Sequence, residues 1–123
     1  MKKLIAITLI LTLNSCYLFK KDGIEVQIKN NSSEPITHVE FTTSEKLEII
    51  EIDKIEPNET VTEFLSMRKN KSDGAYSLSF TRTSGKKEIR GDGYYTNGGS
   101  LDHWVDFIVE NDTIIVKFDA PIY

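Results

Sequence analysis

The feature that most constrains the fold is an apolar–polar alternation with a period of two residues, which recurs along most of the chain. It is clearest in residues 24–28, 76–80 and 105–109, where apolar side chains occupy every second position. Successive side chains of a strand point to opposite faces of a sheet, so this pattern predicts strands with one buried face. A helical period is almost absent. The sequence therefore predicts an all-β fold.

Short polar segments separate the alternating stretches. Asn, Ser, Asp, Gly and Pro, the residues that favour turns, are concentrated at residues 30–35, 56–59, 72–74, 84–85 and 111–112. These boundaries leave room for seven to nine strands. Many short strands at regular spacing are typical of sandwiches and barrels. We therefore predict a single antiparallel β-sandwich with an immunoglobulin-like layout, and a small β-barrel is the alternative.

Two local patterns predict backbone details. The doubled Ile49-Ile50 shifts the alternation by one residue, which predicts a bulge or a bend at that point. Asn111-Asp112 lies between two alternating stretches, and both residue types tolerate the positive φ of a tight primed turn. This corner predicts the closing hairpin of the domain.

The N-terminus has the layout of a secretory signal peptide. Lys2 and Lys3 precede a mostly aliphatic stretch at residues 4–13, and the small Ser15 comes just before Cys16, the chain's one cysteine. The stretch is too short for a membrane-spanning helix, which needs about 20 residues. We expect residues 1–15 to be a signal peptide.

Leu13-Asn14-Ser15-Cys16 resembles the lipobox of bacterial lipoproteins. The resemblance implies that Cys16 is acylated, becomes the mature N-terminus and anchors the protein in the lipid bilayer. Residues 16–23 are then the lipidated N-terminus and a short tether, and residues 24–123 the β-sandwich domain. Tyr17 follows the cysteine, without the aspartate that retains lipoproteins at the inner membrane. We therefore expect a cell-envelope protein on the outer membrane, facing the periplasm.

The order of the turns and the closing hairpin resembles that of small uncharacterised lipoproteins of Bacteroidota. The resemblance implies an immunoglobulin-like sandwich in the cell envelope, and it brings no catalytic residue with it. Asp112-Thr113-Ile114 is similar to the O-glycosylation acceptor of exported proteins from these bacteria. This likeness implies that Thr113 can carry a glycan, although a plain turn residue is the alternative.

The charge of the chain restricts its partners. Fifteen basic and nineteen acidic residues give a net charge of −4, and cleavage before Cys16 makes it −6 by removing Lys2 and Lys3. An acidic body argues against nucleic acid or anionic lipid as a partner, since both require clustered cations. We expect a non-catalytic binding or structural module that meets an unidentified envelope protein through the Gly93–Trp104 loop or an exposed strand edge. A glycan-binding module and an immunity or inhibitor lipoprotein are the alternatives.

Residues 91–104 depart from the pattern of strands and turns and are expected to form a long loop. They contain four of the seven glycines and the single tryptophan. Aromatic rings beside amide and carboxylate groups suit a sugar, and binding residues concentrate on loops. The candidate ligand or partner residues are Asp92, Tyr94, Tyr95, Asn97, Asp102 and Trp104. The other interpretation is that these aromatic rings cover the edge of the core.

Catalytic, metal and cofactor motifs are missing from the sequence. No serine lies in an activating Gly-x-Ser-x-Gly context, and no glycine-rich phosphate loop precedes a helix. His38 and His103 have no metal-ligand spacing. We therefore expect no enzymatic activity, no metal site and no cofactor.

Overall fold

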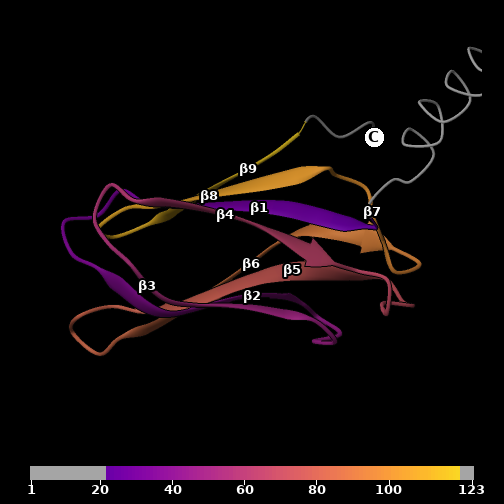
Figure 1. Ribbon diagram of the computed structural model, residues 1–123, viewed down its shortest axis with the longest axis horizontal. Helices are drawn as coiled ribbons and strands as arrows, with labels where there is room; N and C mark the ends of the chain where they lie inside the picture. The colour runs from indigo at the N-terminus through magenta and orange to yellow at the C-terminus, as the bar shows by residue number, and fades with distance from the viewer. Residues whose placement is uncertain (1–21, 120–123) are drawn as a thin grey trace, which may run out of the picture.

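A computed structural model describes residues 22–119. This part of the chain forms two packed β-sheets (Figure 1). The predicted β-sandwich is confirmed. Cys16 and the signal sequence lie outside the described residues. Within residues 22–119 no helix is long and apolar enough to cross a bilayer.

The first sheet has four strands in the order β4-β1-β8-β9. Their bounds are β1 (Gly23–Asn30), β4 (Thr60–Ser66), β8 (Trp104–Val109) and β9 (Ile114–Phe118). β1 pairs antiparallel with β4, and β8 pairs antiparallel with β9. β1 and β8, however, are parallel, with Val26 opposite Val105. One central pair therefore departs from the antiparallel arrangement that the sequence predicts.

The second sheet has five strands in the order β3-β2-β5-β6-β7, with all neighbours antiparallel. Their bounds are β2 (Ile36–Thr43), β3 (Ile49–Ile55), β5 (Gly74–Thr81), β6 (Lys87–Thr96) and β7 (Gly99–Ser100). Figure 1 shows β2, β5 and β6 in the layer below β1 and β8.

The core lies between the sheets, where the alternating apolar side chains meet. The inward positions expected from the three clearest stretches are all buried, which confirms the predicted faces: Ile24, Val26, Ile28, Tyr76, Leu78, Phe80, Val105, Phe107 and Val109. Aromatic rings join the layers, because Phe41 of β2 packs edge-on against Phe107 of β8 with ring centroids 5.7 Å apart. Burial of this row fixes which face of each strand points inward.

The two local backbone predictions have different outcomes. The bulge expected at Ile49-Ile50 is wrong, since β3 keeps a regular register with β2. The irregularity is in β2, where the pairing with β5 shifts between Thr37 and Glu40 around His38, which has φ of 50°. Ile50 faces the core and Ile49 is 48% exposed, so the doubled isoleucine simply places one side chain on each face.

The closing hairpin forms where it was expected, between β8 and β9. The Glu110 amide donates to the Thr113 carbonyl at 2.9 Å, which closes the corner. Neither Asn111 nor Asp112 has positive φ, so the primed turn predicted from these residue types is wrong.

The long loop predicted for residues 91–104 is also wrong over half its length. β6 extends as one strand to Thr96, and a turn at Asn97-Gly98 leads into β7. Residues 101–103 then form a short link to β8, which begins at Trp104. Cross-strand pairing with β5 overrides the turn tendency of the glycines in β6, because the paired backbone satisfies its hydrogen bonds.

One end of the sandwich is closed by a buried polar network around Asn30 and Arg82, and we call it the pinned end. The Asn30 side chain is fully buried, and its nitrogen donates to the carbonyls of Glu34 and Ile55, both at 2.9 Å. Its oxygen accepts from the amide and the hydroxyl of Ser32. Every hydrogen-bonding group of this amide is used, so the turn after β1 is held in one geometry.

Candidate functional site

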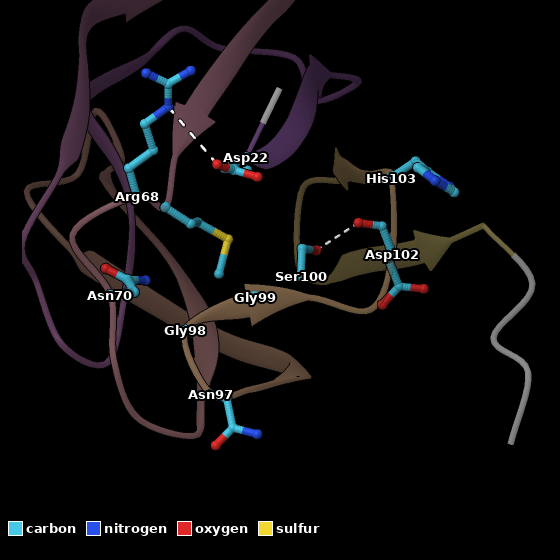
Figure 2. Close-up of a pocket in the computed structure, with 11 residues that line it drawn as sticks. Asp22, Arg68, Asn70, Asn97, Gly98, Gly99, Ser100, Asp102 and His103 are labelled. Carbon is cyan, nitrogen blue, oxygen red and sulfur yellow. Dashed lines mark hydrogen bonds and ion pairs between the residues drawn. The ribbon is translucent and has the colours of Figure 1, made fainter. Parts of the chain in front are cut away.

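At the opposite end of the sandwich is a cleft of about 480 Å³ (Figure 2). We call this the cleft end. Three separate segments line the cleft: the start of β1, the residues after β4, and residues 97–103, which run from the turn before β7 into the link before β8. The strands that converge here are far apart in the sequence, and the sheet pairing brings their ends together.

The rim of the cleft carries opposite charges. The Nε of Arg68 lies 3.9 Å from Oδ2 of Asp22, and both side chains are more than 70% exposed. Figure 2 shows the two side chains pointing toward each other. An ion pair this long and this exposed to water is weak, so either group can turn to another charged partner at little cost.

The floor of the cleft is built from backbone and a buried amide. Asn70 is 8% exposed, and its side-chain nitrogen donates to the Thr43 hydroxyl at 3.2 Å. Gly98 has φ of 76°, and a Cβ there would lie 2.1 Å from the Asn70 carbonyl oxygen. Only glycine fits this close approach of two backbones.

One wall of the cleft is the link between β7 and β8. The Ser100 hydroxyl donates to the Asp102 carbonyl at 2.5 Å, as drawn in Figure 2. The Tyr76 hydroxyl lies 2.6 Å from the Ser100 oxygen. This chain of hydrogen bonds connects the link to β5 in the core.

Asp119, directly after β9, holds the same link from the outside. Its carboxylate accepts from the His103 amide at 2.9 Å and from the Trp104 amide at 3.4 Å, and it contacts the His103 ring nitrogen at 2.9 Å. Burial opposes ionisation of Asp119, but hydrogen bonds from His103 and Trp104 outweigh it and lower the pKa of this carboxyl. Asp119 is therefore an ionised acceptor that ties β9 to the link.

Asp102 is the opposite case. Its residue is 4% exposed, and its Oδ1 has no hydrogen-bond partner among residues 22–119. Burial raises the pKa of Asp102, and the charge of Asp119 and a hydrogen bond to Asp119 raise it further. A buried carboxyl without full solvation favours its neutral form.

The structure separates the aromatic candidates from one another. Tyr95 is fully buried, and its hydroxyl donates to Glu45 at 2.9 Å. Tyr94, on the other face of β6, is 46% exposed. Trp104 is half-buried at the start of β8, in the other sheet. These three side chains do not form one stacking platform.

The Tyr95 contact belongs to a small latch at the cleft end. Glu45 also accepts from the amides of Lys71 and Ser72, at 3.0 and 3.2 Å. These bonds, with the Lys71 amide first, lower the pKa of Glu45. The aromatic ring that was a candidate ligand contact thus fastens the segment that follows β4.

The polar candidates have separate positions. Asn97 and Asp102 both line the cleft. Asn97 has φ of 50° and its amide donates to Asp73. Asp92 lies on β6, where it pairs with Arg90 at 3.1 Å. Thr113 is exposed in the closing hairpin, where its hydroxyl is accessible.

Sequence reasoning missed most of the cleft. Asp22, Arg68 and Asn70 of the cleft, and Asp119 beside it, were not candidates, since each belongs to an ordinary polar turn or strand end. Asp22 lies near Arg68 because β1 pairs with β4, and the link before β8 lies beside them because β1 is parallel to β8. No local sequence pattern predicts these pairings. Within residues 22–119, no three His, Cys, Asp or Glu side chains gather closely enough to hold a metal ion.

Comparisons with known proteins add support for the fold and nothing more. No family model matches the chain, and no curated protein matches it either. A protein from Eubacterium rectale, solved by NMR, has a similar structure, with a TM-score of 0.55 and 10% sequence identity. The alignment covers 83% of this chain and 93% of that protein. At this identity the similarity concerns the arrangement of strands.

Proposed function

We propose that this chain is a lipid-anchored protein of the cell envelope, attached to the outer membrane through acylated Cys16 and facing the periplasm. Its β-sandwich acts as a non-catalytic module that binds an envelope protein. The support comes from the signal-like N-terminus and the lipobox-like residues before Cys16. Two or more acyl chains suffice for stable anchoring.

The observation that carries this proposal furthest is where the tether would join the domain. Asp22 lines the cleft, and only residues 17–21 lie between it and Cys16. Six residue steps of at most about 3.6 Å reach roughly 20 Å. An anchor at Cys16 would therefore keep the cleft end near the bilayer and leave the pinned end and the sheet edges free for a partner.

A non-catalytic role agrees with how charged groups in the cleft and beside it are used. Asp119 accepts backbone hydrogen bonds, and Asp22 pairs with Arg68. These groups thus serve the local structure of the cleft end.

The anchor is tested by feeding cells an alkyne-bearing fatty acid and detecting the tagged protein after click labelling. We expect label and membrane association in the native chain and loss of both in Cys16→Ala. Label retained in Cys16→Ala would reject the acylation site. A chain that leaves the cell without label would reject the anchor.

The partner is tested by placing a photo-cross-linking residue at Asn31 in one variant and at Asn97 in another. Both side chains are on exposed turns, at the pinned and the cleft end respectively. We expect a discrete protein adduct from position 31 and not from position 97. Lipid adducts alone at both positions would reject a protein partner for the free end.

A further inference from the structure

We propose that the free edge of β9 pairs with β9 of a second copy of this chain. The two strands run antiparallel about a two-fold axis, so that two four-stranded sheets become one continuous sheet. The inference goes beyond the proposed function. It rests on residues 22–119 alone, so it does not depend on the anchor.

The backbone of β9 is unpaired on one side. β9 is the last strand of the first sheet, and Figure 1 shows it at the margin of the upper layer. The Glu110 amide bonds to the Thr113 carbonyl at the hairpin. Because bonded pairs of an antiparallel ladder alternate, Ile115 and Lys117 are the residues of β9 that bond to β8. Within residues 22–119, the backbone amides and carbonyls of the rest of the strand point outward without a hydrogen-bond partner: Ile114, Val116 and Phe118.

β9 is held firmly against the core, although one of its edges is open. The ring centroids of Phe118 and Tyr76 lie 6.2 Å apart. A Cβ on Gly93 of β6 would come within 2.4 Å of the Phe118 ring, so the two sheets meet closely here. A strand that is already ordered loses little conformational entropy when it pairs with another strand. The edge is therefore preformed for binding.

The other free edges carry charges that oppose pairing, or are short. Glu63 of the edge strand β4 lies opposite the buried Val26, which places a charge on the inward face of that strand. Glu88 of β6 lies opposite the buried Phe80 in the same way, and β7 has two residues. β3 carries charges along its length: Glu51, Asp53 and Lys54. Short strands and charged edges are common means by which natural sheets prevent pairing with a further strand.

β9 has little of this protection. Its register with β8 is regular, and its inward row is entirely apolar and only partly buried: Ile114, Val116 and Phe118. On the outer face, Ile115 is 41% exposed and lies opposite Ile108 of β8. The one charged residue of the strand, Lys117, is on that outer face, opposite Asp106. An unpaired edge with an apolar inward face is a site for a further strand.

The sequence of β9 is complementary to itself, which favours a second copy as the occupant. In the antiparallel register centred on Val116, all five residues of the strand are paired. Ile114 is then opposite Phe118 of the second copy, so the two inward rows bury each other. Ile115 is opposite Lys117 of the second copy, and no like charges face each other. A register centred on Lys117 would instead place two lysines opposite one another.

The two-fold arrangement is compatible with an anchor at the N-terminus. The axis is perpendicular to the joined sheet, so equivalent points of the two copies lie at the same height along it. The starts of the two β1 strands are such points. Two tethers that begin there can reach one bilayer lying across the axis.

The first test is sedimentation equilibrium of the full chain in detergent micelles, which gives the dissociation constant of the dimer. Ile115→Lys places a second lysine opposite Lys117, and by symmetry it does so twice, so we expect at least about tenfold weaker association. Ile115→Glu places an acid opposite Lys117 and should tighten the dimer. Position 115 is exposed, and Trp104 fluorescence checks that each variant is folded.

Ile89→Lys is the matched control. Ile89 is 69% exposed on the edge strand β6, in the other sheet, so this variant should keep the native dissociation constant. Loss of the dimer in Ile89→Lys, or equal weakening by Ile115→Lys and Ile115→Glu, would overturn the proposal. A full chain that stays monomeric at its highest soluble concentration would also overturn it and leave the edge to a strand of another protein.

A second measurement needs no variant. In hydrogen exchange at rising protein concentration, the amides of Ile114, Val116 and Phe118 should gain protection, because they acquire acceptors in the second copy. The amides of Ile115 and Lys117 are bonded to β8 already and should not change. If the chain sediments as a dimer and the first three amides gain no protection, the contact lies elsewhere and the proposal is wrong.

Discussion

At the pinned end the buried amide of Asn30 has partners for both its nitrogen and its oxygen. At the cleft end, one oxygen of the buried Asp102 carboxyl has no hydrogen-bond partner within residues 22–119. Each residue lies beside a turn that closes the sandwich. A neutral amide has fixed donors and acceptors, so backbone groups can satisfy all of them. The donors of a carboxyl group depend on its protonation state, so the same partners cannot satisfy both forms.

The arginines differ in the same way. Arg82 at the pinned end is mostly buried, lies 2.6 Å from Glu88 and donates to the Glu110 carbonyl at 2.9 Å. Arg68 at the cleft end is 73% exposed and 3.9 Å from its partner. One end is built for a single geometry, and the other keeps groups that can change partners.

We expect the largest difference in stability between the two ends from substitution of Asn30. Asn30→Ala removes the side-chain hydrogen bonds to the Ile55 and Glu34 carbonyls and to the Ser32 amide, although the Glu34 carbonyl still accepts from the Ser32 hydroxyl. We expect a loss of about 3 kcal/mol of unfolding free energy. Urea denaturation measures it. Asn31→Ala, which removes an exposed bond to Glu110, is the control and should cost less than about 0.5 kcal/mol. Equal effects would mean that the pinned end is not pinned by its buried amide.

Gly98→Ala tests whether the backbone at the floor of the cleft can move to accommodate a side chain. The new Cβ would press on the Asn70 carbonyl, and the residue would keep a positive φ, so we expect a loss of about 2–3 kcal/mol in urea denaturation. Gly85→Ala also has positive φ but meets no atom within 4 Å, so it should cost only about 1 kcal/mol. A Gly98→Ala loss as small as that of Gly85→Ala would show that the cleft floor moves freely.

The arginine comparison predicts a smaller difference. Arg82→Ala removes a buried pair, a bond to the Glu110 carbonyl and a contact with the Phe80 ring, and should cost about 2 kcal/mol. Arg68→Ala should change stability by less than about 0.5 kcal/mol, because its pair is exposed. Thermal unfolding of the two variants, measured side by side, checks the ratio. A larger loss of stability in Arg68→Ala than in Arg82→Ala would contradict the view that the pinned end is the more rigidly held of the two.

Asp119→Asn should have the smallest effect and depend on pH. Because the folded state lowers the pKa of Asp119, its ionised form stabilises the fold above the ordinary value of 3.8, and this contribution disappears as pH falls through the lowered pKa. We expect a loss of at most about 1 kcal/mol at pH 7, since the side chain is partly exposed. Urea titrations at pH 7 and at pH 2.5 should differ in this loss. A loss that is equal at both pH values would exclude an ionic role for Asp119.

Much of the fold could be read from the chain without a structure. Alternation at residues 24–28, 76–80 and 105–109 identified the inward faces, because a strand has two faces and the apolar one is more stable when it is buried away from water. The turns at 84–85 and 111–112 were also found, since local residue chemistry dominates there. The φ angles of Asn111 and Asp112 were predicted wrongly, because Asn and Asp tolerate positive φ but do not require it.

The sequence by itself thus determined the all-β class, the inward rows and the positions of most turns, all of which depend on neighbouring residues and solvent. Only the tertiary structure decided that β1 lies parallel to β8, that residues 91–96 are strand, and that Asp102 is buried at the cleft. These outcomes depend on contacts between segments far apart in the chain. Periodicity carries no information on which strands become neighbours. The pairing of the strands is what brings the charged residues of the cleft end together.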